Sequence, residues 1–404
     1  MRLDVRPIAR IARHLVYRYE PLWFRQLRMF LALPDYPGAK LTLKRVANCY
    51  RNRWEMRHLS TELKSYPLKL TVEPINTCNL SCPACFTGDG QTSRPRTAMP
   101  MDFYQRLLDE AGDYLWQIEF CNWGEPLLNK QIATMIRAAT DRGIGTLVST
   151  NFSFRFDERR AEDLVRSGLT ILGVSIDGTQ QETYEQYRVG GNLETVFANC
   201  RKIRDAKRRL GLHTPNVMWI FHVFPHNVYD VAPARTMARD LDMKLIVEKG
   251  WVVGEEWERN GFFKFRDRVK PFPCLFLWNQ TVVNSDGGVS PCCGTFYRED
   301  DMGTMALEPS ANGALSLREV WNGDRFRQAR EMYQSRGPAP AEDHVCYNCP
   351  ATVVWHEWQQ HLARGEDPEA FETDITPNDS FNYFWQRRPP GAAPPRRRLT
   401  IGTR

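Results

Sequence analysis

From residue 68 onward, the spacing of apolar positions changes in a regular way along the chain. Short apolar runs, typical of strands, are separated by longer stretches in which apolar residues recur every three to four positions, as in helices. The predicted strands are 68–73, 116–121, 145–150, 170–176, 216–223 and 243–248. The predicted helices are 102–114, 129–142, 157–167, 193–209 and 228–240. This alternation predicts an α/β fold, a parallel sheet wrapped by helices, with too few units for a closed eight-stranded barrel.

The first 67 residues follow a different pattern. Ile8, Ile11 and Leu15 recur at helical spacing with arginines between them, and a run of aromatic and aliphatic residues follows over 22–31. A basic amphipathic helix can lie on an anionic membrane surface, or it can pack on a neighbouring domain with its arginines in water. We expect a helical extension and favour packing, with peripheral membrane contact as the alternative.

Beyond residue 250 the alternation of strands and helices ends. Two apolar runs flank Asp286-Gly287-Gly288, which predicts a β-hairpin, and a helix is predicted over 315–330. Residues 366–404 become rich in proline and arginine, a composition typical of a disordered basic tail. The predicted organisation is a basic helical extension (1–67), a partial barrel (68–250), a small cysteine-rich domain (251–355) and a C-terminal extension (356–404).

Charge is distributed unevenly over the 404 residues. The formal net charge is +6, yet residues 1–67 carry 14 Lys or Arg against 5 Asp or Glu, and residues 387–404 carry six arginines and no acid. The body between them is therefore acidic. An enzyme acting on nucleic acid would be expected to have a basic patch near its site, so we expect no nucleic-acid partner.

The chain contains 11 cysteines. No secretory signal and no uncharged run of transmembrane length is visible in the sequence. We therefore expect a cytoplasmic protein, with the inner membrane surface as a possible peripheral location. In a reducing compartment clustered cysteines bind metal rather than form disulfides.

Three cysteines, Cys78, Cys82 and Cys85, follow the first predicted strand directly. Thiolates this close in one loop can converge on a single soft metal centre, either an iron–sulfur cluster or, with a fourth ligand, zinc. Zinc loops more often contain paired C-x2-C units, so we favour the cluster. Three ligands leave one iron of a four-iron cluster without a protein ligand, free to bind a substrate or cofactor.

Further polar motifs follow the next strands, and in parallel α/β folds the carboxyl ends of the strands form the site. A carboxylate such as Glu125 suits an ammonium group, and a guanidinium such as Arg188 suits a carboxylate. Each motif also has a simpler interpretation: a turn that begins a helix, a capping residue, or a surface arginine. The motif residues are Cys121, Gly124, Glu125 and Pro126 after the second strand, Ser149 and Asn151 at the third, and Ser175, Asp177 and Arg188 after the fourth.

A second set of cysteines lies in the C-terminal third, namely Cys274, Cys292, Cys346 and Cys349. The predicted hairpin brings Cys274 near Cys292. Cys293 could replace Cys292 as a ligand, and four thiolates of this kind could hold zinc as well as an iron–sulfur cluster. The remaining cysteines, Cys49 and Cys200, lie in helical patterns and are predicted to be core residues.

The C-x3-C-x2-C loop, Gly124-Glu125-Pro126 and the Ser-Ile-Asp-Gly segment at 175–178 resemble the motifs of the radical S-adenosylmethionine (SAM) superfamily. The C-terminal cysteines are similar in order to its SPASM domain. Two positions depart from the family pattern: Ala84 replaces an aromatic residue and Trp123 replaces a glycine.

The resemblance implies cofactors and roles for these residues. Cys78, Cys82 and Cys85 would hold a SAM-binding 4Fe–4S cluster, and the four C-terminal cysteines an auxiliary 4Fe–4S cluster. Gly124 to Pro126 would bind the SAM amino group, Ser175 and Arg188 its carboxylate, and Ser149 or Asn151 its ribose. Phe86 and Asp177 complete the implied cofactor-binding set, and adenine-binding residues are not recognisable in 219–226.

The implied activity is reductive cleavage of SAM followed by abstraction of a hydrogen atom from a substrate, with an external flavodoxin- or ferredoxin-like reductant. A carbohydrate or lipid-linked small molecule is the expected substrate, oxidised or epimerised. Alternatives are a peptide substrate, and a non-catalytic metal-binding protein. Cys121 is either a buried small hydrophobic residue or a hydrogen-atom donor. The candidate substrate-facing residues are Glu119, Asn122, His222 and Glu248.

Overall fold

The computed structural model describes residues 33–250, 273–308, 315–334 and 343–367, together with positions 370, 371, 373, 383, 384 and 387. The predicted amphipathic helix near the N-terminus lies outside the described residues. Residues 388–404 of the predicted basic tail also lie outside them.

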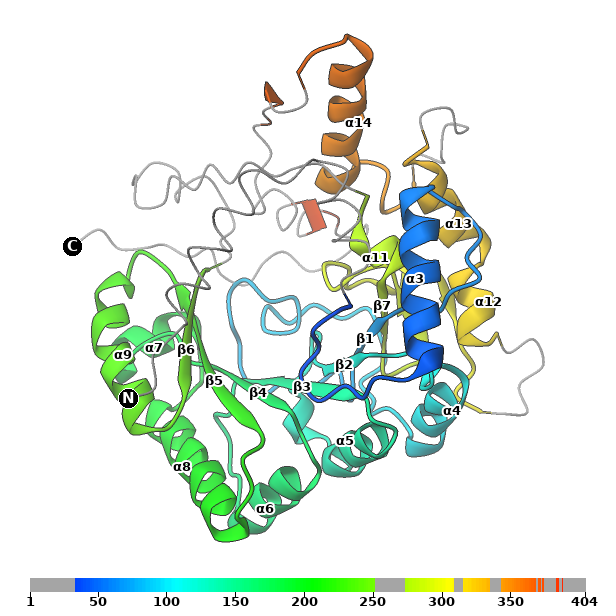
Figure 1. Cartoon of the computed structure of the whole chain (residues 1–404). Helices are drawn as coiled ribbons and strands as arrows, with labels where there is room; N and C mark the ends of the chain where they lie inside the picture. Colours follow the sequence, from blue (N-terminus) through cyan, green and yellow to red (C-terminus); the bar gives the residue numbers. More distant parts are fainter. Residues whose placement is uncertain are drawn as a thin grey trace, which may run out of the picture.

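The described strands form one nine-stranded sheet in the order β6-β5-β4-β3-β2-β1-β7-β8-β9 (Figure 1). The first six strands are all parallel and overlap the six predicted strands, which confirms the α/β partial barrel. Their bounds are Lys69–Val72 for β1, Gln117–Phe120 for β2, Gly145–Thr150 for β3, Ile171–Ser175 for β4, Asn216–Val223 for β5 and Lys244–Lys249 for β6.

Strand β7 (Gln280–Val283) adds a feature that the sequence did not predict. It pairs in parallel with β1, from Lys69 opposite Gln280 to Val72 opposite Val283. It also forms the predicted hairpin with β8 (Gly288–Ser290), and β9 (Gly303–Thr304) pairs with β8. The cysteine-rich region therefore continues the barrel sheet and does not form a separate sheet. This continuity places the carboxyl end of β1, which precedes the first cysteine loop, beside the carboxyl end of β7.

The predicted helices are present on the outer side of the sheet (Figure 1). They are amphipathic and bury their apolar side: in α6, for example, Ala161, Leu164 and Val165 are buried. The bounds are Met101–Ala111 for α4, Ile132–Asp141 for α5, Glu158–Arg166 for α6, Leu193–Leu210 for α8 and Val231–Asp240 for α9. The short helices Pro126–Leu128 (η1), Gln181–Tyr187 (α7) and Val228–Asp230 (η2) lie in connections.

Strand register divides the sheet into two faces. Leu70, Val72 and Phe120 are fully buried in the core beneath the helices, so Thr71 and Glu119 project from the opposite face, the barrel interior. Because the strands pair in parallel, residues that are partners on neighbouring strands project from the same face of the sheet. The polar residues that share the interior face with Glu119 include Ser149, Ser175, His222 and Glu248, and apolar residues such as Leu147, Met218 and Ile220 lie on the same face.

Helix α3 (Leu43–Arg57) packs against the amino ends of the strands. The Arg45 side chain is 1% exposed and donates to five backbone carbonyls, among them Leu115 at 2.7 Å and Gly143 at 2.7 Å, which precede β2 and β3. Helix α3 is thus packed on the barrel, whereas the amphipathic helix for which packing was predicted lies outside the described residues. With the amino ends covered, the carboxyl ends of the strands remain for the site.

The C-terminal region contains α11 (Leu275–Trp278), α12 (Leu317–Trp321), α13 (Asp324–Glu331) and α14 (Pro350–Ala363). The single helix predicted over 315–330 was wrong, because the chain turns at Asn322, whose side chain bonds both the amide and the carbonyl of Leu63. Helix α14 also crosses the predicted domain boundary after residue 355. Among the described helices, none has the length and apolar composition needed to cross a membrane.

Candidate functional site

The loop of Cys78, Cys82 and Cys85 lies directly after β1, at the carboxyl edge of the sheet. Two backbone hydrogen bonds hold it from opposite sides: the amide of Ser81 donates to Val189 (2.9 Å), and that of Glu125 donates to Thr77 (2.9 Å). The three cysteines pack together with Leu80, Ala84, Tyr187 and Phe224 in one small apolar cluster.

The surroundings of these thiols suit an anionic cluster. Burial raises the pKa of Cys78, Cys82 and Cys85 to about 11 each. Backbone N–H groups oppose this rise by donating toward sulfur, that of Leu80 to Cys78 and those of Gly88 and Thr87 to Cys85. The thiols are therefore neutral without metal, and metal binding must release their protons.

Two side chains add to the donors around the sulfurs. Nδ2 of Asn151 lies 3.6 Å from Sγ of Cys78, and Nη1 of Arg188 lies 4.0 Å from Sγ of Cys82. Gly88 leaves room for the turn, since a Cβ there would lie 2.6 Å from the backbone N and O of Cys82. Hydrogen bonds to cysteine sulfur and nearby positive charge stabilise iron–sulfur clusters, so these residues fit a 4Fe–4S cluster.

The Gly-Glu-Pro segment lies against the cysteine loop. A Cβ on Gly124 would stand 1.8 Å from the carbonyl oxygen of Ile75, so only glycine permits this approach. The Glu125 side chain is 2% exposed. It accepts hydrogen bonds from the hydroxyl of Thr150 (2.7 Å) and the amides of Asn151 (2.8 Å) and Leu127 (3.0 Å). Glu125 thus ties the ends of β2 and β3 together.

Burial raises the pKa of Glu125 to about 7, and the three hydrogen bonds limit the rise. Asn151 is similarly engaged by protein groups, since its side chain also donates to Asn79 (3.1 Å) and accepts from the amide of Ser153 (2.8 Å). Both predicted cofactor residues therefore have structural partners in addition to any contact with a ligand.

Asp177 orients Arg188. Its carboxylate is fully buried and accepts from Nε of Arg188 (2.6 Å) and from the amide of His222 (2.7 Å). Nδ1 of His222 lies 3.0 Å from the same carboxylate. Burial alone would raise the pKa of Asp177, but Arg188 and His222 outweigh it and lower the pKa to about 2. The guanidinium is therefore fixed with its other nitrogens directed toward Cys82 and His222.

The other predicted residues lie in two places. Ser149 and Ser175 are on the interior face of the barrel, beside the cysteine loop. Phe86 is 1% exposed and stacks on Phe296, with ring centroids 4.9 Å apart, and its edge contacts Trp123. It therefore joins the cysteine loop to the C-terminal region.

Sequence reasoning missed an aromatic stack next to Cys82. The rings of Tyr187 and Phe224 are 4.2 Å apart, and Phe224 stacks on His226 at 5.5 Å. Nε2 of His226 is buried and has no hydrogen-bond partner among the described residues. The aromatic residues directly after the fifth strand could have indicated this stack from the sequence, but they match no recognisable motif.

The C-terminal cysteines gather at one place. Burial raises the pKa of Cys292 well above its usual value, and the thiols of Cys293, Cys349, Cys346 and Cys274 add to the rise. Cys293 itself is exposed, and its charged neighbours are Glu119 and Lys69 of the barrel interior. This arrangement favours Cys292 over Cys293 as a ligand.

Backbone donors also face this second set. The amides of Phe276 and Leu277 donate toward Cys274, and those of Ala351 and Thr352 toward Cys349, which precedes α14. The residues therefore fit a second anionic cluster. Within the described ranges, no three His, Cys, Asp or Glu side chains stand close enough to hold a single metal ion. Cys49 and Cys200 are buried core residues, as predicted.

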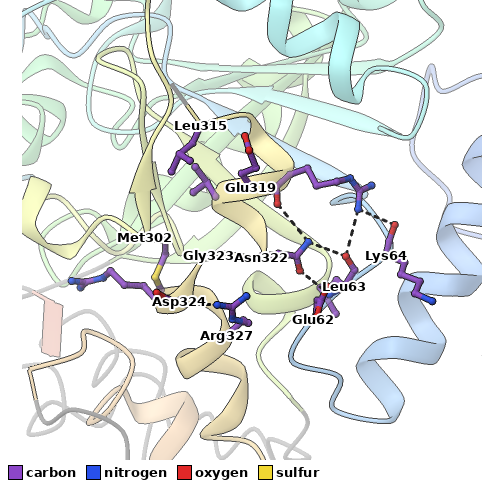
Figure 2. A pocket seen from close by; sticks show the side chains of 13 residues that line it. Glu62, Leu63, Lys64, Met302, Leu315, Glu319, Asn322, Gly323, Asp324 and Arg327 are labelled. Atoms are coloured by element: carbon purple, nitrogen blue, oxygen red, sulfur yellow. Dashed lines mark hydrogen bonds and ion pairs between the residues drawn. The ribbon is translucent and has the colours of Figure 1, made fainter. Parts of the chain in front are cut away.

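A cavity of about 770 Å³ lies away from both cysteine sets, between α12, α13 and residues 62–64 (Figure 2). Two of its arginines already have partners: Arg318 donates to the carbonyl of Lys64, and Arg327 pairs with Asp324. We assign it no part in the chemistry.

Comparison with known families agrees with this geometry. The radical SAM superfamily model matches residues 72–228, and the model of the SPASM iron–sulfur cluster-binding domain matches residues 274–350. The chain belongs to the radical SAM superfamily of enzymes and carries a C-terminal SPASM domain. Its cofactors are a SAM-binding 4Fe–4S cluster, SAM and auxiliary iron–sulfur.

Individual relatives are distant. An AdoMet-dependent heme synthase of Methanosarcina barkeri is 27% identical over 165 residues, which are 41% of this chain and 45% of the relative. A PqqA peptide cyclase of Granulibacter bethesdensis is 28% identical over 142 residues, 35% of this chain and 36% of the relative. The chain thus spans less than half the length of these two relatives. The structure of Streptococcus suis SuiB aligns with a TM-score of 0.50 and 14% identity over 79% of each chain, which shows the fold alone.

Proposed function

We propose that this chain is a radical SAM oxidoreductase or epimerase that removes a hydrogen atom from a carbohydrate or lipid-linked small molecule. The observation that carries the proposal is the meeting of the cysteine loop, Gly124 and Arg188 at one edge of the sheet, beside an interior face that holds the Lys69–Glu119 ion pair. Cys78, Cys82 and Cys85 would hold the front cluster, and Cys274, Cys292, Cys346 and Cys349 the auxiliary one. When bound, these cofactors supply the one-electron chemistry that breaks a C–H bond.

The protein's own contribution is binding and orientation. Arg188, locked by Asp177, offers a fixed guanidinium that suits the carboxylate of SAM. Ser175 lies on the interior face at the same strand end and is assigned to the same group. Gly124 brings its loop close enough to the cysteine loop for backbone groups to reach the amino group of SAM.

The interior face supports a polar substrate. Glu119 lies 3.1 Å from Lys69, so a carboxylate and an ammonium stand together in the barrel, with His222 and Glu248 on the same face. Such groups can exchange their present partners for the hydroxyls and charged substituents of a polar ligand, which hydrocarbon cannot offer. Cys121 follows β2, and its register places it on this face, where its thiol could give a hydrogen atom to the substrate radical in an epimerisation. The thiyl radical left on Cys121 would then take one electron from the external reductant and a proton from solvent.

A peptide substrate is the second candidate, favoured by the similarity to the PqqA peptide cyclase. In either case we propose a cytoplasmic enzyme reduced by a flavodoxin- or ferredoxin-like protein. Peripheral contact with the inner membrane surface would depend on residues 1–32, which lie outside the described part.

The substrate class can be tested with isotope transfer. Cells grown in deuterated medium provide a glycan fraction and a peptide fraction, each supplied to the reconstituted enzyme with SAM and dithionite. We expect deuterium in the 5′-deoxyadenosine formed with the glycan fraction. Deuterium from the peptide fraction alone would overturn the carbohydrate proposal in favour of the second candidate.

A further inference from the structure

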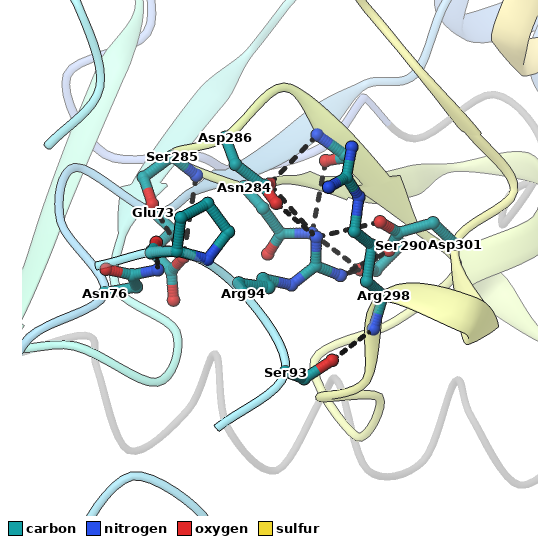
Figure 3. Close-up of polar contacts among 12 residues, drawn as sticks. Glu73, Asn76, Ser93, Arg94, Asn284, Ser285, Asp286, Ser290, Arg298 and Asp301 are labelled. Atoms are coloured by element: carbon teal, nitrogen blue, oxygen red, sulfur yellow. Dashed lines mark hydrogen bonds and ion pairs between the residues drawn. The ribbon is translucent and has the colours of Figure 1, made fainter. Parts of the chain in front are cut away.

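A buried arginine, Arg94, joins the segment after the cysteine loop to the β7–β8 hairpin of the C-terminal region, called here the auxiliary hairpin (Figure 3). The Arg94 side chain is 6% exposed. Its Nη1 donates to Asp286 (3.0 Å) and to Asp301 (2.8 Å), and its Nη2 donates to the other oxygen of Asp301 (2.5 Å). Its Nε donates to the carbonyl of Phe296 (3.3 Å). Both aspartate side chains are 5% exposed, so the three charges are held almost without water.

Arg94 and its two aspartate partners come from different cysteine regions of the chain. Arg94 lies in the segment between Cys85 and α4. Asp286 is in the β7–β8 turn, and Asp301 precedes β9. The backbone of Gly288 packs closely against this ion pair. A Cβ on Gly288 would lie 2.2 Å from Oδ2 of Asp301 and 2.5 Å from Nη1 of Arg94.

Other contacts converge on the same hairpin from the loops around the SAM site. The hydroxyl of Ser285 donates to Glu73 at the end of β1 (3.2 Å), and Nδ2 of Asn122 donates to Asn284 (3.0 Å). The indole N–H of Trp123 donates to the carbonyl of Thr295 (2.8 Å). Two segments of the SAM site, at Glu73 and at Asn122–Trp123, thus contact residues 284–301, and Arg94 joins a third segment to the same residues through two buried carboxylates.

We propose that Arg94 is a positioning residue that fixes the separation of the two clusters by locking the cysteine-loop segment to the auxiliary hairpin. The proposal rests on the cluster ligands assigned under the proposed function. A planar guanidinium can bond Asp301 through two nitrogens and reach Asp286 at the same time, whereas a lysine ammonium cannot reproduce this fork. The rate of electron transfer between two clusters and their magnetic coupling both fall steeply with distance. The contacts of Arg94 with Asp286 and Asp301 should therefore affect both quantities.

The test compares full-length variants reconstituted with iron and sulfide. R94K keeps the charge and loses the fork. The triple variant R94M/D286N/D301N removes all three charges together, so that no buried carboxylate is left without its cation. R209K is the matched control, because Arg209 pairs with Glu162 at 2.9 Å on the outer helices. The readout is the microwave power that half-saturates the electron paramagnetic resonance signal of the reduced front cluster, with C349A as the reference lacking the auxiliary cluster.

We expect the wild type and R209K to share a high half-saturation power, because the nearby auxiliary cluster speeds relaxation. R94K and the triple variant should fall toward the C349A value while keeping wild-type iron content and 5′-deoxyadenosine release. Unchanged half-saturation in both Arg94 variants, or a wild type equal to C349A, would overturn the proposal. Failure of the wild type to bind iron or cleave SAM would instead refute the proposed function, which separates the two outcomes.

Discussion

Asp177 and Arg188 form a buried ion pair, with Oδ2 of the aspartate 2.6 Å from Nε of the arginine. The pair lies beside Cys82 and holds the guanidinium that we assign to the SAM carboxylate. A residue read from the sequence as part of a cofactor motif therefore acts by orienting a second one. The pair has consequences for both stability and SAM affinity.

Replacing Asp177 by Asn should destabilise the protein by about 3 kcal/mol, because it leaves a largely buried guanidinium without its counter-ion. Affinity for SAM, measured by equilibrium dialysis under anaerobic conditions, should fall because Arg188 is no longer held in place. Urea unfolding measures the stability. A variant as stable as the wild type, with unchanged SAM affinity, would show that the pair has no orienting role.

The pH dependence of this effect follows from the lowered pKa of Asp177. Its folded pKa of about 2 lies below the unfolded value, so its stabilisation is present above about pH 4 and is lost as the pH falls toward 2. The stability difference between wild type and D177N should therefore shrink over that range. A difference that stays constant with pH would contradict this assignment.

Glu125 should make stability change with pH in the opposite direction to Asp177. Its folded pKa of about 7 lies above its unfolded value, so its contribution to stability is fully present at low pH and is lost as the pH rises to 7. Between about pH 5.5 and about pH 8, wild type should lose about 2 kcal/mol relative to E125Q. Urea unfolding of the two metal-free proteins at several pH values tests this, with E162Q as the control, because Glu162 is partly exposed on the outer side of α6.

Gly124→Ala should disrupt the site. The added Cβ would collide with the carbonyl of Ile75, so the Gly-Glu-Pro loop must move from the cysteine loop. We expect at least a tenfold loss of SAM affinity (about 1.4 kcal/mol). Gly211→Ala is the matched control, since nothing lies within 4 Å of a Cβ there and only its positive φ is strained, at a stability cost of about 1 kcal/mol. Equal SAM affinity in both variants would contradict the close-approach argument.

The two adjacent cysteines of the C-terminal region can be distinguished by iron content. C292A should lose the auxiliary cluster, and with it about half of the bound iron, because its thiol lies among Cys274, Cys346 and Cys349. C293A should retain that iron, since Cys293 is more exposed than Cys292 and is not assigned as a ligand. The reverse pattern of iron loss would exchange their roles.

The sequence predicted the barrel well because its strands and helices have clear and different periodicities. Residues such as Cys78 or Gly124 could be proposed as site residues from the sequence because their motifs are local. The parallel pairing of β7 with β1 was missed, since nothing in the run Thr281 to Val283 distinguishes a hairpin strand that stands alone from one that also extends a distant sheet.

Arg94 was missed for a related reason. Its partners Asp286 and Asp301 are nearly two hundred positions or more away, and Asp286 was read only as a turn residue. The break at Asn322 was also invisible, because it depends on hydrogen bonds to Leu63. Long-range polar contacts of this kind leave no periodic pattern in the sequence.

The most direct test of the account is release of 5′-deoxyadenosine from SAM by the anaerobically reconstituted protein with dithionite. We expect about eight irons in the wild-type chain, with release abolished in C78A and retained in C349A, because only the front cluster has an iron without a protein ligand. A wild type that binds zinc in place of iron, or a C78A variant that still releases 5′-deoxyadenosine, would contradict the account.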